Sequence, residues 1–505
     1  MKRIPRVLAI FLIVCLLAFT HGTASAAPDV LYQRLVADVS MFDPFTTGDL
    51  VVQMVHYQIY DSLFYELEDG TAVPNICTKY ELTNDNKTMI FTIREGVKFH
   101  NGDIVTPEDV EFSLNTAIAS PFTSKVTSMM DRAELLSDGR VALHLRYPFA
   151  SLLGCLVNSS LSIVPKKIYE ADPAGFAKNP VGSGPYTLGN IRPGETIEFI
   201  AFPDYWRGEA KIKRAVSRII PDNTTALLAL EAGDLHISQP SQDFSDRDAI
   251  KSNPNLIYYE SVQPCFFMFG FNCEAEPFNN VTLRKAIAAA INKEELIVGA
   301  INGMGGWIEA AICTNLAQYP KDFKGIQYNP EEAKRLLVEA GYPNGLEFTC
   351  RVISATNYSI PAEIIQAQLR RIGVNMKVEA MERSSWMDLV YANTQHETTY
   401  YSHAISVNDA DFCTYPYFHS STANGKGPNI YNYKNPVMDD LLERARVTPD
   451  GDERNELYRK VAEIVRDDAV TVPTYMPYKV MAAAKEVKGM YADPMLRNYL
   501  YNYSW

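Results

Sequence analysis

Apolar and polar residues alternate along several short stretches of the chain, and these stretches end at residues that favour turns. Residues 91–99 have the period of half-buried strands, and Asn101-Gly102 then supplies residues able to adopt a positive φ. Thr106 follows as a candidate N-cap with Pro107 in the first helical position, and Asp109 can close a capping box. The pattern therefore predicts strand, tight turn and capped helix in this order.

The second half of the chain alternates between helical and strand patterns with short connections. Asn329 can cap a helix that ends at Gly341, and an apolar–polar alternation follows over residues 346–352. A second helix is predicted at residues 361–372, and another alternation covers residues 374–380. A strand, a helix and a strand joined by short loops indicate a right-handed crossover and a parallel strand pair.

The remaining patterns extend this α/β organisation. Asn435 can cap another helix, residues 457–464 continue as a further one, and residues 197–201 alternate as a strand. Residues 266–271 form a dense apolar strand. The chain of 505 residues exceeds the size at which a single core keeps growing, so two or more lobes are expected. No Ser- or Gly-rich linker divides the chain, and ordinary strands must therefore connect the lobes.

The N-terminus has the three parts of a secretory signal peptide. Residues 2–6 carry three positive charges, residues 7–19 form an unbroken apolar run, and Ala24-Ser25-Ala26 offers a cleavage site. The apolar run is shorter than the roughly 20 residues that span a membrane. We therefore expect residues 1–26 to be removed, which leaves a soluble periplasmic protein. Cys15 leaves a lipid anchor as the alternative, although the residue before it is larger than is usual at a lipidation site.

Charge and cysteine content narrow the possible partners. The net charge is −13 and the isoelectric point about 5.2, which argues against nucleic acid or an anionic membrane surface as a partner. Removal of the signal peptide would leave seven of the eight cysteines, an odd number that cannot pair completely within one chain. Cys273 with Cys413 is the first pair to test for a disulfide, and at least one thiol must stay unpaired.

A series of motifs runs along the chain. They are Tyr60-Asp-Ser-Leu-Phe64, FTIREGVKFHNGD (91–103), TPEDVEFSL (106–114), NPVGSGPY (179–186), FPDYW (202–206), ALEAGDL (229–235), VTLRKAI (281–287) and NPEEAKRLLVEAG (329–341). In this order the motifs resemble the signature of the family-5 extracytoplasmic solute-binding proteins, the peptide- and nickel-binding receptors of ABC importers. The resemblance covers essentially the whole mature chain, and the motif at residues 91–103 is long enough to make chance agreement improbable.

The resemblance implies a two-lobed periplasmic-binding-protein (clamshell) fold of the α/β class. The first lobe would cover residues 27–271, with an extra subdomain at about residues 57–183. The second lobe would cover residues 272–472, and residues 473–505 would return to the first lobe. In such a fold the ligand is held between lobes that close about the two crossings.

The segment at residues 400–412 resembles the stretch that members of this family turn toward the cleft, which commonly ends in Asp-Pro-Asp followed by Phe. Asp409 and Asp411 keep both acids, and Phe412 follows them. Ser406 stands where peptide-binding members carry a further aspartate that receives the ligand's α-amino group. We therefore expect Asp409 or Asp411 to receive a cationic group, so that replacing either by asparagine would weaken binding while leaving stability unchanged.

Other residues are candidates for the walls of the ligand site. Tyr401 and Trp307, together with Phe412, are expected to supply apolar surface, and His403 lies in the same segment as Tyr401. Residues 384–443 contain two lysines and no arginine. The sequence therefore offers no arginine in this segment that could hold a ligand carboxylate, which weakens the interpretation as a receptor for free peptides.

Motifs of catalysis and cofactor binding are absent from the sequence. It has no Gly-x-Ser-x-Gly elbow, no His-Glu-x-x-His and no Walker-type loop. His396, His403 and His419 share one region, but scattered histidines are more often surface or core residues than metal ligands. We therefore expect no enzyme activity, no cofactor and no bound metal.

Three functions remain open at this point. The first is a receptor for a small peptide or amino-acid derivative, which works as a monomer with the permease subunits and ATPases of an ABC transporter. The second keeps the fold but binds a nickel chelate or another cationic or neutral solute, which His403, His419 and the acidic segment would favour. The third is a secreted hydrolase, for which no nucleophile or metal motif is present.

Overall fold

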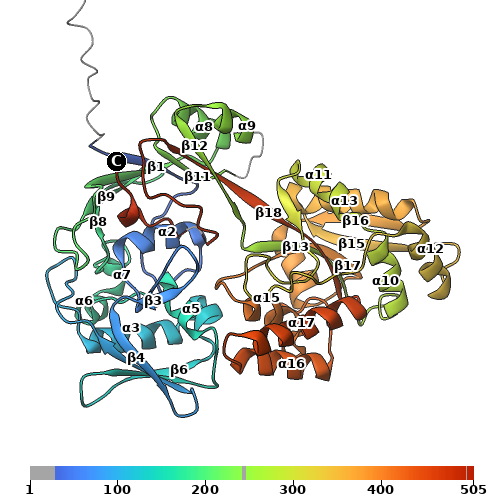
Figure 1. Ribbon diagram of the computed structural model, residues 1–505, viewed down its shortest axis with the longest axis horizontal. Coiled ribbons are helices and arrows are strands. Elements are labelled where there is room, and N and C mark those ends of the chain that lie inside the picture. Colours follow the sequence, from blue (N-terminus) through green and yellow to red (C-terminus); the bar gives the residue numbers. More distant parts are fainter. Residues whose placement is uncertain (1–28, 242–245, 496) are drawn as a thin grey trace, which may run out of the picture.

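A computed structural model describes residues 29–241, 246–495 and 497–505, and these residues fold into two lobes that lie side by side (Figure 1). The α/β class and the two-lobed architecture expected from the sequence are confirmed. The predicted signal peptide at residues 1–26, including Cys15, lies outside the described residues. No helix among the described residues is long and apolar enough to cross a membrane.

Lobe I, on the left in Figure 1, is built on a mixed sheet. Its first strand, β1 (Leu31–Leu35), is parallel to both of its neighbours, β10 (Arg214–Ile219) and β11 (Ile237–Ser241). On the β10 side the sheet continues with β9 (Thr196–Ala201) and β8 (Tyr186–Arg192), and these pairs are antiparallel. The apolar residues that alternate at 197–201 point into the lobe I core, as predicted. The strands are β1 (Leu31–Leu35), β8 (Tyr186–Arg192), β9 (Thr196–Ala201), β10 (Arg214–Ile219) and β11 (Ile237–Ser241), and the helices are α2 (Leu50–Ile59), α8 (Asn223–Glu231) and α9 (Asp246–Ser252).

A separate four-stranded antiparallel sheet lies within the range expected for the extra subdomain of lobe I. Thr106 and Asp109 form the predicted capping box, in which each side chain accepts a hydrogen bond from the other residue's backbone N–H. The elements are β4 (Cys77–Thr83), β5 (Thr88–Ile93), β6 (Met130–Leu135), β7 (Val141–Leu145), α3 (Pro107–Ala119), α4 (Ser124–Thr127), α5 (Leu152–Leu156), α6 (Lys166–Ala171) and α7 (Pro173–Phe176), with a small hairpin of β2 (Phe64–Glu66) and β3 (Ala72–Pro74) beside them.

Lobe II is built on a second group of strands with helices around it. The predicted parallel strand pair is confirmed, because β15 (Glu347–Ile353) and β16 (Asn375–Met381) are parallel neighbours. Asn329 caps its helix by accepting from the Glu332 N–H, also as predicted. The other elements are β13 (Cys265–Phe271), β14 (Gly305–Trp307), β17 (Thr398–Ala404), α10 (Val281–Ala289), α11 (Lys293–Ile301), α12 (Pro330–Glu339), α13 (Thr356–Arg370), α14 (Arg383–Trp386), α15 (Ala410–Phe418), α16 (Pro436–Val447) and α17 (Asp452–Asp467).

One helix boundary differs from the sequence-based prediction. The helix expected to begin at Pro361 begins at Thr356, so that Pro361 lies inside α13. Proline has no N–H to donate to the carbonyl four residues earlier, which usually places it in the first turn. Here the segment before it is held as a helix although no side chain caps its start.

Two stretches of chain cross between the lobes. One is the link at Gln263-Pro264, between β12 (Leu256–Val262) and β13. The other is β18 (Thr471–Ala484), which pairs with β13 and β14 through its first half and with β12 and β11 through its second half. Figure 1 shows β18 running directly from one lobe into the other. The strand at Cys265–Phe271 pairs with β17 and packs in the core of lobe II, although the boundary expected from the sequence placed it at the end of lobe I.

Each lobe has its own hydrophobic core, and the cysteines lie mostly within these cores. All seven cysteines of the described part are free thiols. The expected pairing of Cys273 with Cys413 is therefore wrong. The sulfur of Cys413 instead lies 3.7 Å from that of Cys313, because α15 packs against the loop that carries Cys313.

Two buried histidines should make the protein less stable in acid. Burial lowers the pKa of His56 to about 3 and that of His396 to about 4, against about 6.5 in an unfolded chain. Below pH ~6.5 the unfolded state therefore binds protons that the folded state does not, and the free energy of unfolding falls by up to about 1.4 kcal/mol per pH unit for each histidine. His56→Gln should reduce this fall in urea unfolding measured between pH 7 and pH 4.5. An unchanged slope would contradict the role of His56.

Candidate ligand-binding site between the lobes

A large cavity lies between the two lobes and has a volume of about 620 Å³. This volume is within the range of pockets that bind small molecules and short peptides. Three parts of the chain that are far apart in sequence line it. They are the lobe I residues 66–72, 150, 151, 153 and 154, the lobe II residues 315–318, 407–409 and Asp450, and the C-terminal residues Tyr491, Asp493, Pro494 and Arg497.

The charged side chains on the cavity wall are predominantly acidic. Among the described residues that line it, six are carboxylates and one is an arginine, Arg497. Amide side chains, such as those of Asn315 and Gln318, add hydrogen-bonding capacity. A wall of this composition attracts positively charged groups and repels free carboxylates. The acids are Glu66, Glu68, Asp69, Asp409, Asp450 and Asp493.

Arg497 is engaged by two of these acids. Its guanidinium nitrogens lie 2.5 Å from Glu66 Oε1 and 2.8 Å from Asp493 Oδ2, and all three side chains are at least nine-tenths buried. Burial lowers the pKa of Arg497, but the two carboxylates outweigh it and raise this pKa well above its usual value. Asn408 of lobe II also donates a hydrogen bond to Glu66 Oε1 over 3.1 Å. The cluster therefore links β2, the C-terminal segment and lobe II at one corner of the cavity.

Asp409 lies on the cavity wall, but an arginine of the same chain already binds it. Its side chain caps α15 by accepting from the Asp411 N–H over 2.8 Å. Both carboxylate oxygens also accept hydrogen bonds from Arg454, at 2.7 and 2.8 Å. The Arg454 side chain is fully buried and donates in addition to Ser151 Oγ of lobe I over 3.2 Å. The geometry assigns Asp409 to helix capping and to the contact between the lobes.

Asp411 has an equivalent partner. Its two carboxylate oxygens accept from Arg446 at 3.0 and 2.9 Å, and its side chain is 4% exposed. Arg446 lies over the ring of Tyr415 and its backbone carbonyl accepts from the Ala150 N–H of lobe I at 2.9 Å. Both arginines lie just beyond residues 384–443, the window in which the sequence showed no arginine.

The remaining candidates lie away from the cavity wall. Tyr401 stacks on Trp386 with ring centroids 4.4 Å apart. His403 is buried, stacks on Tyr417 and shares a hydrogen bond of 3.0 Å between its Nε2 and the hydroxyl of Tyr431. Burial lowers the pKa of His403 well below its usual value. These residues build the interior of lobe II.

Ser406, Phe412 and Trp307 have three different positions. Ser406 directly precedes the cavity-lining residues 407–409, and its carbonyl is 3.5 Å from the side-chain nitrogen of Asn158 in lobe I. Phe412 packs edge-on against Phe149 of lobe I. Trp307 is 56% exposed on β14 and borders a separate open cavity of about 250 Å³.

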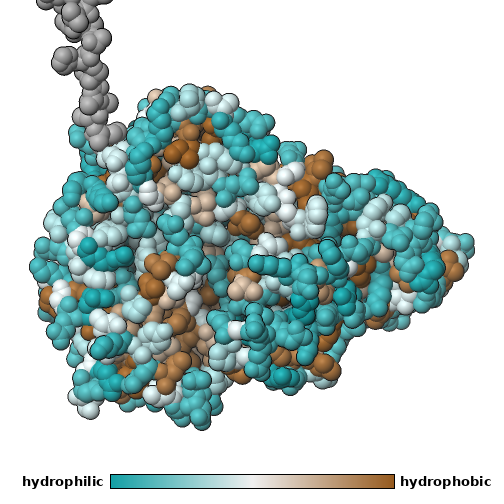
Figure 2. All heavy atoms as spheres, viewed as in Figure 1, coloured by the Kyte–Doolittle hydropathy of each residue, from teal (hydrophilic) through white to brown (hydrophobic). Residues whose placement is uncertain are grey.

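The two lobes contact each other directly at the edge of the cavity, where Val407 lies. The side chain of Val407, from lobe II, packs in the core of lobe I. Figure 2 shows the two lobes meeting along a boundary, with apolar atoms gathered on the lower part of lobe I beside it. These contacts define a closed arrangement in which the cavity is bounded by both lobes.

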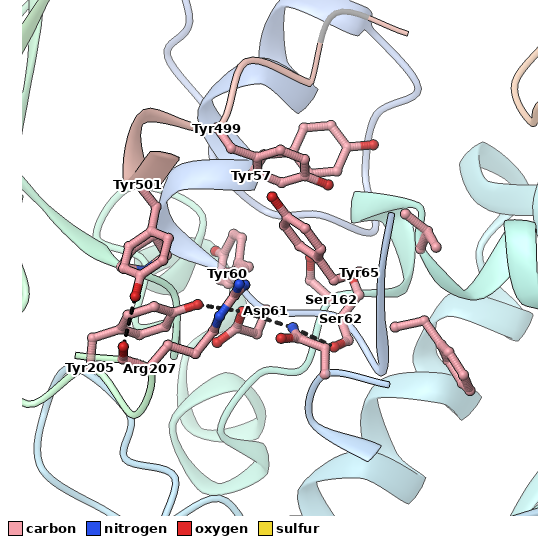
Figure 3. A pocket seen from close by; sticks show the side chains of 14 residues that line it. Tyr57, Tyr60, Asp61, Ser62, Tyr65, Ser162, Tyr205, Arg207, Tyr499 and Tyr501 are labelled. Atoms are coloured by element: carbon pink, nitrogen blue, oxygen red, sulfur yellow. Dashed lines mark hydrogen bonds between the residues drawn. The ribbon is translucent and has the colours of Figure 1, made fainter. Parts of the chain in front are cut away.

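A second, much smaller cavity lies within lobe I, beside the strand that carries the cavity-lining Glu66. It has a volume of only about 20 Å³, and Figure 3 shows Asp61 in its middle with Tyr205 and Arg207 beside it. Asp61 accepts hydrogen bonds from Asn75, Trp206 and Tyr205 at 2.9 to 3.3 Å, yet burial raises its pKa to about 6. The aromatic rings and hydrogen bonds around Asp61 hold the start of β2, the strand that ends at Glu66.

Sequence reasoning missed most of the cavity wall. The signal that could have found part of it is the Asp69-Gly70 turn between β2 and β3, since Asp-Gly is typical of hairpin turns. The C-terminal segment at residues 491–497 carried no such signal. Among the described residues, no group of three or more metal-ligating side chains could hold a metal ion.

Comparison with known proteins gives consistent relatives over nearly the whole chain. Residues 71–425 match the middle region of the bacterial extracellular solute-binding proteins, family 5. The glutathione-binding protein GsiB of Pectobacterium atrosepticum is 28% identical over 465 residues, which cover 90% of this chain and 89% of that protein. GsiB of Shigella boydii serotype 4 is 26% identical, and the match covers 94% of each protein.

Solved structures show the same fold. The ABC transporter-associated periplasmic binding protein DppA from Helicobacter pylori, in complex with the peptide STSA, has a TM-score of 0.78 and 27% identity. The match covers 94% of this chain and 98% of that one. HbpA2 from Haemophilus parasuis has a TM-score of 0.85 at 24% identity, covering 94% of this chain and 99% of that one. The chain therefore belongs to family 5 of the bacterial extracellular solute-binding proteins.

Proposed function

We propose that this protein is a monomeric periplasmic receptor that captures a small peptide or amino-acid derivative between its lobes and delivers it to an ABC importer. The cavity of about 620 Å³, to which both lobes and the C-terminal segment contribute, is the observation that carries this proposal. Permease subunits with their ATPases would take up the solute after release, and the receptor would leave it chemically unchanged.

The acidic wall narrows the chemistry of the solute. Arg497 is fully engaged by Glu66 and Asp493, so it offers no free charge to a ligand carboxylate at this wall. Glu68 and Asp69 have no such arginine partner among the described residues and are exposed beside the cavity. The wall therefore favours a cationic or neutral group of the solute, such as the amine of a peptide.

Mass spectrometry of the small molecules released from natively purified protein tests the proposal directly. A peptide or amino-acid derivative should be recovered intact at about one molecule per chain. When the same compound is added at about 100 times its dissociation constant, it should stabilise the folded state by about 2.7 kcal/mol. Recovery of a chemically altered compound, or stabilisation by no small solute, would contradict a receptor role.

Closure of the lobes can be tested at their contact. A Cβ at Gly154 of α5 would lie 2.7 Å from Val407 Cγ1 of the other lobe, which is closer than such atoms can approach. Gly154→Ala should therefore oppose closure by about 1–3 kcal/mol, a roughly 5- to 150-fold rise in the dissociation constant. Calorimetry with the co-purified solute measures this dissociation constant.

The double variant Gly154→Ala with Val407→Ala removes the clashing atom and should regain most of the lost affinity. Gly48→Ala is the control, because a Cβ there makes only an ordinary contact of 3.6 Å. An unchanged affinity of Gly154→Ala would show that the solute is bound without closure at this contact.

A further inference from the structure

Two thiols inside lobe II are in direct contact. The thiol of Cys413, in α15, donates to the sulfur of Cys313 over 3.7 Å, although the two cysteines are 100 residues apart in sequence. Both residues are fully buried. A disulfide places its two sulfurs about 2.05 Å apart, and small rotations about the two Cα–Cβ bonds close the remaining gap. The fold therefore brings two thiols to positions from which a covalent bond can form.

Cys313 belongs to a long irregular loop of lobe II. Among the described residues, positions 308–329 between β14 and α12 contain no helix or strand. Loops of this length without secondary structure are uncommon in compact domains and are often functional. Residues 315–318 of this loop line the interlobe cavity. The contact between the thiols thus lies next to a part of the cavity wall that no regular element holds in place.

The other half of the contact also leads to the cavity. Asp409 lines the cavity and caps α15, and Cys413 lies in the following turn of this helix. A bond between the two sulfurs would fix the irregular loop to α15, so that two parts of the lobe II wall keep their relative position. A cross-link between residues this far apart in sequence also removes conformational freedom from the unfolded chain.

The surroundings of Cys313 indicate when such a bond would form. The contact with Cys413 and burial raise the pKa of the Cys313 thiol well above its usual value. Because the thiolate is the attacking species in thiol–disulfide exchange, the folded protein exchanges slowly. Oxidation therefore takes place while the chain is folding, before α15 packs over the loop.

We propose that Cys313 and Cys413 form a disulfide when the chain folds in an oxidising compartment outside the cytoplasm. This inference rests on the periplasmic location in the proposed function. The thiolate of one cysteine attacks a disulfide-bonded oxidant, forms a mixed disulfide and releases one thiol. The thiolate of the other cysteine then attacks the cysteine sulfur of the mixed disulfide and releases the second thiol. The cysteines lose two protons and two electrons, and the oxidant takes up both as its disulfide becomes two thiols.

Refolding of the mature chain tests the pairing without relying on export. The reduced chain is unfolded in urea and diluted into buffer with 2-hydroxyethyl disulfide, the remaining thiols are alkylated, and trypsin digestion follows without reduction. Trypsin releases residues 294–321, with Cys313 as their one cysteine, and residues 384–426, with Cys413 as theirs. We expect these two peptides to be joined, with a mass two hydrogen atoms below the sum of the separate peptides.

Other linkages define the opposite result. Residues 252–284 carry Cys265 and Cys273, and the charge of Cys265 acts on Cys313. A bridge from residues 252–284 to either peptide, or complete alkylation of Cys313 and Cys413, would overturn the proposal. Protein exported with its own signal peptide should carry the same link. A link in the refolded protein that is missing from the exported protein would support the pairing and contradict the periplasmic location.

Thermal unfolding supplies a second readout. The oxidised protein should unfold about 5–15 °C above the same protein scanned with dithiothreitol. Replacing both Cys313 and Cys413 by alanine should remove this difference. Cys350→Ala is the matched control, because Cys350 is also fully buried in the lobe II core, and it should keep the difference. A difference that persists in the double variant would overturn the assignment to this pair.

Discussion

Replacing Arg454 by methionine is expected to lower the free energy of unfolding by about 3–5 kcal/mol. The guanidinium is fully buried and binds both oxygens of Asp409, so its removal leaves a buried carboxylate without a cation. The hydrogen bond to Ser151 across the lobe boundary is lost at the same time. Urea unfolding of the ligand-free protein measures the effect.

The control for this variant is Asp450→Asn. Asp450 also lies 2.7 Å from Arg454, but its side chain is 72% exposed. Exposed ion pairs contribute roughly 0–1 kcal/mol, so this variant should remain close to wild type. If Arg454→Met also lowered the free energy of unfolding by no more than this, the buried pair would not stabilise the fold as expected.

The buried pair of Asp409 and Arg454 also changes the stability expected for Asp409→Asn. Asparagine can still cap α15, but Arg454 would lose its buried partner. The variant should therefore lose stability without any ligand present. The sequence alone predicted an unchanged stability, because Arg454 lies 45 residues further along the chain.

Arg497→Met is the second variant with a large expected effect, again about 3–5 kcal/mol of unfolding free energy. It leaves Glu66 and Asp493 buried near each other with no cation between them. Two such carboxylates favour protonation, which raises their pKa above the unfolded values. The folded variant then binds protons that the unfolded chain releases, so its deficit relative to wild type should shrink as the pH falls from 7.5 toward 5.

This pH signature separates the charge effect from a loss of packing. A deficit that is the same at pH 7.5 and pH 5 would indicate lost packing instead. Adding Asp493→Asn to Arg497→Met removes one of the two charges and should recover part of the stability at neutral pH. Lys98→Met serves as the control for an exposed ion pair and should cost no more than about 1 kcal/mol.

Helix starts and strand pairs of short range could be predicted from the sequence. Thr106 and Asn329 cap their helices as expected, because a cap acts on backbone groups two or three residues away. The parallel pair β15–β16 was predicted from the alternation of apolar and polar residues on either side of the helix α13. The boundary of α13 was misplaced, since the segment before Pro361 is helical without a local capping signal.

The candidate site was much harder to predict. Asp409 was placed on the cavity wall, but its arginine lies in a different helix and its role in capping competes with ligand binding. His403 and Tyr401 have the alternation of strand β17, yet only the packing of lobe II shows that their rings stack on other aromatic residues.

The family, the α/β class and the two-lobed architecture could be predicted from the sequence, because motifs, caps and periodicity are local properties of the chain. Tertiary structure alone decided which charges meet. Glu66 and Arg497 are more than 400 residues apart in sequence, and their contact depends on the return of the chain through β18 to lobe I. The cavity and its acidic wall result from this return. No local pattern reports them, since a buried charge is defined by what surrounds it after folding.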